Sequence, residues 1–76
     1  MSLNEMVKNK VYIIDQVNAE GELRHKLLNM GITPGVKIEF IRKSIFGDPL
    51  AFRVRDYIIA LRKEEASKII IKDINP

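Results

Sequence analysis

The stretch LLNMGITPG, residues 27–35, decides the fold, because it ends a helix and begins a strand. Leu27 and Met30 lie at helical spacing and continue an apolar stripe that starts one turn earlier. Gly31 follows at the place where a helix ends in a residue of positive φ, which glycine adopts without a steric clash. The pattern therefore predicts a helix over residues 20–30 that stops at Gly31.

The second half of the stretch predicts a turn into a strand. Ile32 stands where an apolar residue folds back on the last helical turn. Thr33-Pro34-Gly35 has the residues of a tight turn, since proline presets φ and glycine supplies a positive φ. Alternating apolar side chains then predict a strand over residues 36–44, with Ile38 and Phe40 facing the core.

The rest of the chain predicts a mainly β domain. Its apolar alternation and turn residues indicate a strand over residues 11–17, a strand through Leu50, Phe52 and Val54, a strand through Tyr57, Ile59 and Leu61, a short helical turn over residues 63–67, and a last strand over residues 69–74. About five short strands with one inserted helix are typical of a small, highly curved barrel, whose closure would remove exposed sheet edges. We expect the largely buried side chains to include Leu27, Ile38, Phe52, Val54, Ile59 and Leu61.

Length and composition indicate one small domain, residues 1–76, without membrane insertion. The chain has no cysteine, which excludes disulfides and thiolate metal sites. No apolar run approaches the roughly 20 residues that span a bilayer, and the first residues lack the basic and apolar regions of a signal peptide. These features predict a cytoplasmic protein. The formal net charge of +3 favours anionic partners only weakly.

Catalytic and metal chemistry find little support in the residue types. The single histidine, His25, stands between Arg24 and Lys26, a cationic neighbourhood that opposes metal binding. Glu64 and Glu65 are adjacent, so they point in different directions on a helical turn. An enzyme needs convergent groups, and a transition-metal site needs several clustered ligands. We therefore predict no catalysis, no cofactor and no tight metal site.

Nucleic-acid binding is an alternative that the middle of the chain raises. The basic residues there are Arg42, Lys43, Arg53, Arg55, Arg62 and Lys63. Phe40 and Phe52 alternate inward, however, and so provide no platform on which bases stack. We interpret the basic cluster as a solvated sheet face and expect no nucleic-acid partner.

A protein-docking surface is the prediction that the exposed apolar positions favour. Ile45 and Phe46 lie in a loop beside Gly47, where burial is hard to arrange, and Ile41 and Ile58 fall on outward strand positions. With a basic rim that also contains Lys43, these positions predict a docking patch of Ile45, Phe46, Arg42, Arg53, Arg55 and Ile58. In a competing interpretation Phe46 folds over the barrel mouth as a lid to the core.

The chain resembles a known family in motifs spread over residues 3–71. These motifs are Glu22-Leu-Arg24, Leu27-Leu28, Met30-Gly31, Thr33-Pro34-Gly35, Phe46-Gly-Asp-Pro49, Arg53-Val-Arg55, Tyr57, Ala60-Leu-Arg62 and Glu64-Glu-Ala66. In this order and spacing they resemble the FeoA family of small ferrous-iron transport proteins. Asn9, Asn29 and Asp56 depart from the family pattern, but at turn or cap positions that tolerate asparagine or aspartate.

The resemblance implies a fold and a partner. The implied fold is a small SH3-like barrel, and the implied protein is a bacterial cytoplasmic accessory of FeoB, a ferrous-iron transporter with a cytoplasmic G-protein domain. The same domain type ends iron- and manganese-dependent repressors, but this chain lacks their DNA-binding and dimerisation helices. We therefore expect a non-enzymatic module that docks on the G-protein domain of FeoB. The alternatives are a protein that binds or senses ferrous iron, and a small RNA-binding barrel.

Overall fold

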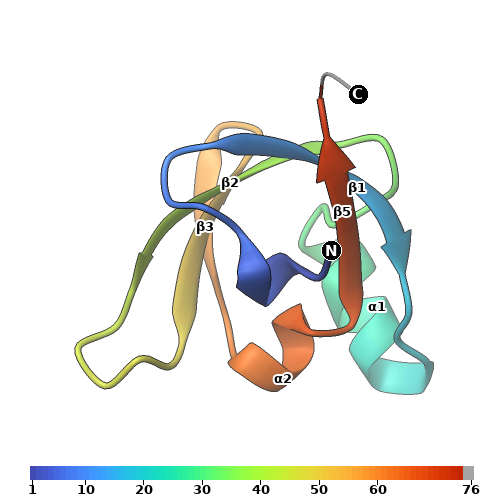
Figure 1. Cartoon of the computed structure of the whole chain (residues 1–76). Helices are drawn as coiled ribbons and strands as arrows, with labels where there is room; N and C mark the ends of the chain where they lie inside the picture. The colour runs from blue at the N-terminus through green and yellow to red at the C-terminus, as the bar shows by residue number, and fades with distance from the viewer. Residues whose placement is uncertain (75–76) are drawn as a thin grey trace.

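The computed structural model describes residues 1–74 and confirms the predicted mainly β domain (Figure 1). Its elements in chain order are a 3-10 turn η1 (Leu3–Glu5), β1 (Val11–Val17), α1 (Gly21–Asn29), β2 (Lys37–Lys43), β3 (Leu50–Val54), β4 (Tyr57–Leu61), α2 (Lys63–Ala66) and β5 (Ile69–Asp73). The inserted helix and the helical turn before the last strand are both where the sequence predicts them. β2 and β5 are slightly shorter than predicted.

The five strands form one antiparallel sheet in the order β4-β3-β2-β1-β5. Two bulges interrupt its ladders. One lies in β1 between Ile14 and Gln16, and the other lies in β2 between Phe40 and Arg42. A bulge bends its strand and increases the local twist, and Figure 1 shows the resulting curled sheet, with α1 and α2 at one end of it.

The end strands of the curled sheet, β4 and β5, are not paired with each other within residues 1–74. The free edge of β5 is occupied by the start of the chain. Ser2 forms a bridge with Ile70, and the Ile71 N–H donates to the Met1 carbonyl at 2.8 Å. The other edge of β5 is paired with β1, so β5 has no free edge with which β4 could pair.

The predicted core is confirmed. All six side chains expected inside are buried, and Phe52 and Val54 are 0% exposed. Phe52 pairs with Phe40 of β2 on one side and with Ile59 of β4 on the other. The two phenyl rings lie 5.6 Å apart at 45°, a tilted arrangement that aromatic pairs prefer.

The predicted helix end is also confirmed. Gly31 has a φ of +87°. Its N–H donates to the Leu28 carbonyl at 3.0 Å, and the Ile32 N–H donates to the Leu27 carbonyl at 3.0 Å. This pair of bonds is the Schellman arrangement, and Ile32 is fully buried against the helix as that arrangement requires.

A contact that the sequence did not indicate lies beside this cap. The Tyr57 hydroxyl of β4 donates to the Met30 carbonyl at 2.6 Å. A Cβ on Gly31 would clash with that hydroxyl oxygen, because it would lie closer than real Cβ contacts. Glycine is therefore needed at position 31 for space as well as for its positive φ.

Glu65 joins the two helices. Its carboxylate accepts a hydrogen bond from Lys26 Nζ of α1 at 2.6 Å and another from the Arg62 N–H, at the start of α2, at 2.9 Å. The Lys26 hydrogen bond, followed by that from the Arg62 backbone, holds the pKa of Glu65 below its ordinary value. The charged form of Glu65 thus stabilises the packing of α1 on α2.

Candidate functional site

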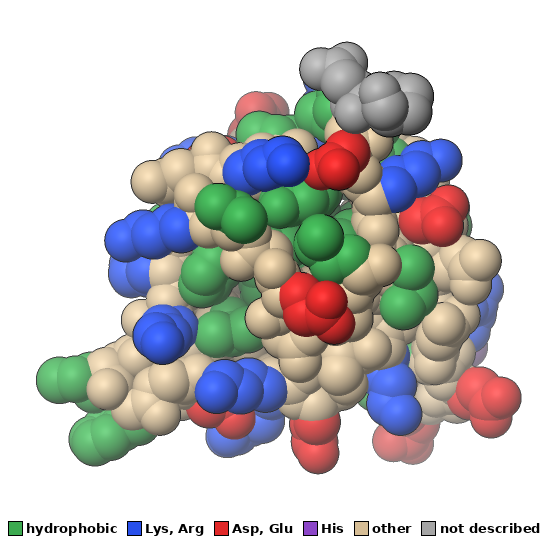
Figure 2. Space-filling model, viewed as in Figure 1, with side chains coloured by type: hydrophobic (Ala, Val, Ile, Leu, Met, Phe, Trp, Pro, Cys, Tyr) green, Lys and Arg blue, Asp and Glu red, His purple; other side chains and the backbone are tan. Residues whose placement is uncertain are grey.

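The loop between β2 and β3 carries Ile45 and Phe46, which we call the tip. The Gly47 N–H donates to the Ser44 carbonyl at 2.8 Å, and the Ser44 N–H donates to the Pro49 carbonyl at 3.0 Å. These bonds close a tight turn with the tip at its centre. Ile45 is 91% exposed and Phe46 is 92% exposed, and Figure 2 shows apolar side chains projecting from this end of the molecule.

The exposure of the tip overturns the interpretation of Phe46 as a lid over the core. The open end of the core is instead covered by the N-terminal segment, in which Leu3 is 1% exposed and Met6 is 8% exposed. The core at this end is thus covered without a contribution from the tip. Two large apolar side chains are therefore free to contact a partner.

The outer face of β2, β3 and β4 holds most of the other predicted docking residues. Side chains of directly paired residues lie on the same face of a sheet. Arg53 is paired with Glu39 and Ile58, and these three form one outward row. Arg53 Nε lies 3.6 Å from Glu39 Oε1 while Ile58 remains 48% exposed, so the row combines one ion pair with an apolar surface.

A second outward row lies nearer the tip and contains Arg42, Ala51 and Ala60. Ile41, which was expected outward, has no partner on β3 and is half-buried, because it is the extra residue of the bulge. The bulge leaves Phe40 inward and Arg42 outward. Of the three arginines predicted for docking, Arg42 therefore lies on the outer face and also near the tip.

The predicted docking residues are thus spread along one face rather than gathered around the tip. Arg55 lies in the two-residue turn between β3 and β4, with a φ of 56°. At about 3.4 Å per residue, roughly 17 Å of strand separates it from Leu50 at the loop end of β3. Arg53 and Arg55 therefore do not rim the tip, although an interface of standard size spans this distance.

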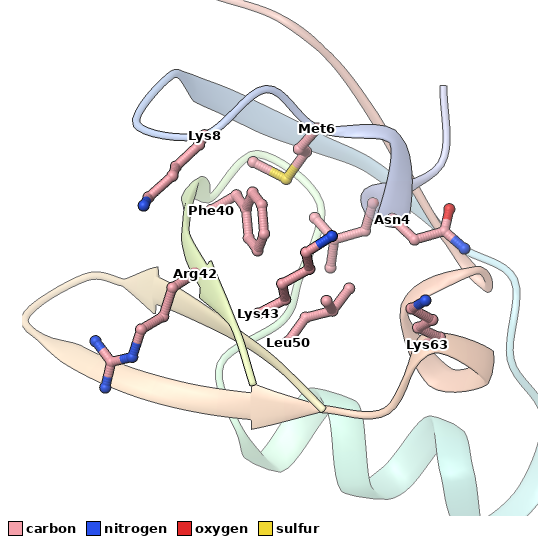
Figure 3. Close-up of a pocket in the computed structure, with 9 residues that line it drawn as sticks. Asn4, Met6, Lys8, Phe40, Arg42, Lys43, Leu50 and Lys63 are labelled. Carbon is pink, nitrogen blue, oxygen red and sulfur yellow. The ribbon is translucent and has the colours of Figure 1, made fainter. Parts of the chain in front are cut away.

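A groove of about 380 Å³ opens beside the tip, and we call it the cationic groove (Figure 3). It lies between η1, the end of β2 and the starts of β3 and α2. Its apolar floor and basic rim are formed by Leu3, Met6, Phe40, Leu50, Lys8, Arg42, Lys43 and Lys63, together with Asn4. Lys43 is paired with the buried Leu50, so its side chain has the inward direction and lies at the mouth of the groove.

The loop and the groove are joined by Lys63. The Lys63 backbone N–H donates to Asp48 Oδ1 at 2.9 Å, which ties the loop to the start of α2. Lys63 Nζ lies 3.7 Å from where a Cβ on Gly47 would stand. Lys63 therefore connects the loop that carries the tip to the rim of the groove.

The sequence did not indicate the groove as a site. In the sequence, Lys43 and Lys63 belong to the basic residues of the middle of the chain, and Lys8 belongs to no motif that points to a site. Lys8 reaches the groove through the N-terminal segment, where the Asn9 N–H donates to the Phe40 carbonyl at 2.9 Å. No local pattern in a single sequence carries that long-range pairing.

Residues that bear on the alternative functions are dispersed. No group of three His, Asp or Glu side chains suited to a metal ion occurs within residues 1–74. Phe52 is fully buried, so its ring is closed to a nucleic-acid base, whereas Phe40 is half-buried. Over the same described range, no helix has the length and apolar character that crossing a membrane requires.

Comparison with known sequences identifies the family. A family model described as the FeoA domain matches residues 1–73. A protein of Helicobacter pylori strain J99 assigned as Fe(2+) transport protein A is 34% identical over 74 residues, which cover 96% of this chain and 95% of that protein. The Fe(2+) transport protein A/Fe(2+) transporter FeoB fusion protein of Porphyromonas gingivalis is 32% identical over 75 residues. That match covers 99% of this chain and 9% of the fusion protein.

Solved structures agree with this result. The iron(II) transport protein A of Clostridium thermocellum is similar with a TM-score of 0.92 at 34% identity, over 97% of this chain and 46% of that chain. The FeoA of Stenotrophomonas maltophilia, described as a prokaryotic SH3 domain protein complexed with zinc, has a TM-score of 0.83 at 24% identity, over 95% of this chain and 89% of that chain. The predicted SH3-like fold is confirmed, and the chain belongs to the FeoA domain family, as its sequence motifs indicated.

Proposed function

We propose that this protein is a non-enzymatic, cytoplasmic accessory of ferrous-iron uptake that docks on the cytoplasmic G-protein domain of a FeoB transporter. The observation that carries the proposal is the Porphyromonas gingivalis relative, whose name describes FeoA and FeoB in one polypeptide. Fusion of two proteins keeps them at a high effective concentration, which is useful when the separate proteins bind each other.

The docking surface that we propose comprises the tip and the outer face of β2, β3 and β4. Its residues are Ile45, Phe46, Arg42, Arg53, Arg55 and Ile58. Phe46 would be the anchor, because a large aromatic side chain that is 92% exposed loses the most contact with water on binding. The arginines would steer an acidic partner surface toward the face and act mainly on the association rate.

Replacement of the anchor tests the proposal. Phe46→Ala should weaken binding of the isolated FeoB G-protein domain by about 2 kcal/mol or more, through faster dissociation. The melting temperature should not change, since Phe46 contributes almost nothing to the core. Val7→Ala is the matched control, because Val7 is a 60% exposed apolar residue outside the proposed face. A folded Phe46→Ala protein with wild-type affinity would refute this role of the tip.

Replacement of a basic residue tests the steering. Arg53→Ala should slow association without accelerating dissociation, and the difference should shrink as salt rises. Lys72→Ala is the control, because Lys72 Nζ lies 3.7 Å from Asp15 Oδ1 in another surface ion pair, one more exposed than that of Arg53 and Glu39. Equal rate changes in the two variants would mean that net charge, rather than this face, guides the encounter.

A further inference from the structure

The cations around the cationic groove, Lys8, Arg42, Lys43 and Lys63, form no ion pair with an acidic side chain within the described residues. The four ion pairs within residues 1–74 use Lys10, Lys26, Arg53 and Lys72. None of the groove cations takes part in them, and no carboxylate lines the groove. Unpaired cations gathered at one opening create a positive potential there that attracts an anionic group.

The apolar floor of the groove favours a ligand that also carries an apolar group. Leu3, Met6 and Leu50 are buried, while Phe40 is half-buried and exposes part of its ring. Figure 3 shows Met6, Phe40 and Leu50 converging on the interior of the groove, with Lys8, Lys43 and Lys63 around the opening and the Arg42 guanidinium pointing outward. A volume of about 380 Å³ lies at the lower end of the range for ligand pockets and accommodates a large apolar side chain.

We propose that the cationic groove binds a short acidic segment of the protein partner, with one large apolar side chain on the floor and flanking carboxylates at the lysines. The inference rests on the proposed docking, because the groove lies at the base of the loop that carries the tip and the segment belongs to the partner that contacts the tip. It adds the chemistry of the partner's contact: aspartates or glutamates on both sides of a leucine or phenylalanine.

Peptide binding tests the inference without the transporter. The probe is the fluorescently labelled peptide DELFED, and its binding is measured by anisotropy at low salt. The peptide DESSED has the same charge without the apolar pair and should bind at least about tenfold more weakly, because the floor then gains no apolar contact. The peptide KKLFKK has the opposite charge and should not bind.

Charge-reversal variants locate the site. Lys43→Glu and Lys8→Glu should each weaken DELFED binding about fivefold or more, since each removes an attraction and adds a repulsion. Lys68→Glu is the matched control, because Lys68 is an exposed lysine outside the groove and outside the ion pairs of the described chain. It should change the affinity less than twofold. Amide NMR spectra of each variant report whether it is folded.

Several results of these measurements would overturn the inference. Equal binding of DELFED and DESSED, an equal effect of Lys68→Glu and Lys43→Glu, or no binding of DELFED at 1 mM would overturn it. Tighter binding of a labelled six-nucleotide oligouridylate than of DELFED would also overturn it in favour of nucleic acid. If the FeoB domain binds while DELFED does not, the groove inference fails and the proposed function stands. If DELFED binds while the FeoB domain does not, the proposed function fails.

Discussion

The contact between Tyr57 and Gly31 makes the substitution Gly31→Ala more damaging than the backbone alone requires. Alanine at a φ of +87° is strained by about 1 kcal/mol. Its Cβ would also clash with the Tyr57 hydroxyl oxygen. The tyrosine must therefore move, and its hydrogen bond to the Met30 carbonyl is lost.

The size of the second effect follows from that hydrogen bond. A typical intramolecular hydrogen bond contributes about 1 kcal/mol net, and displacement of the ring adds some loss of packing. Gly31→Ala should therefore destabilise the domain by roughly 2–3 kcal/mol in total. For a domain of this size, each kcal/mol lowers the melting temperature by about 4–8 °C, so the expected decrease is roughly 8–24 °C.

A double-mutant cycle with Tyr57→Phe separates the two effects. Phenylalanine lacks the hydroxyl, and the next ring atom, Cζ, would lie at an ordinary 3.6 Å from the new Cβ. In the Tyr57→Phe background, Gly31→Ala should cost only the backbone part, about 1 kcal/mol. Urea denaturation followed by circular dichroism measures all four proteins. An identical cost of Gly31→Ala in both backgrounds would refute the argument that the hydroxyl occupies the space of a side chain at position 31.

Two further predictions concern stability. Phe52→Ala should cost roughly 3–5 kcal/mol, because Phe52 is 0% exposed and packs on Phe40, and chemical denaturation will measure it. A wild-type melting temperature would contradict the packing of β3 on β2. Glu65 has a folded-state pKa below the unfolded value, so its stabilisation is fully present above about pH 4.5 and is lost as the pH falls through the folded pKa. Wild type should therefore lose more stability than Glu65→Gln between pH 6 and pH 3 in matched thermal melts. Equal losses would exclude this carboxylate as the cause.

Local chemistry explains why much of the fold is predictable. Gly31 and Ile32 follow directly from the rules of helix capping, and the turn that comes after them depends only on neighbouring residues. The inward positions of Phe52, Val54, Ile59 and Leu61 follow from a period of two over short strands without bulges. In each case the decisive interaction lies within a few residues of the position that it determines.

The features that the sequence does not predict depend on contacts between distant segments of the chain. The Tyr57 hydroxyl meets a carbonyl 27 positions earlier in the chain, and Lys8 lines the groove together with residues of β2, β3 and α2. The occupation of the β5 edge by Met1 and Ser2 is of the same kind. Strict alternation also fails at Ile41, because a bulge depends on the register with the neighbouring strand rather than on the residues of β2 alone.

The unpaired Ile41 has a consequence for how members of the family should be aligned. With regular pairing and no bulge, Ile41 would face Ala51 and Arg42 would face Leu50, which would direct a guanidinium toward the apolar interior. A relative that lacks one residue at this point would keep the inward and outward order of every neighbour, since only the unpaired residue is removed. In an alignment, a one-residue gap opposite Ile41 would therefore indicate a relative with a straighter β2 and the same outward side chains. A gap opposite Arg42 would instead indicate a relative that lacks this positive charge on the outer face.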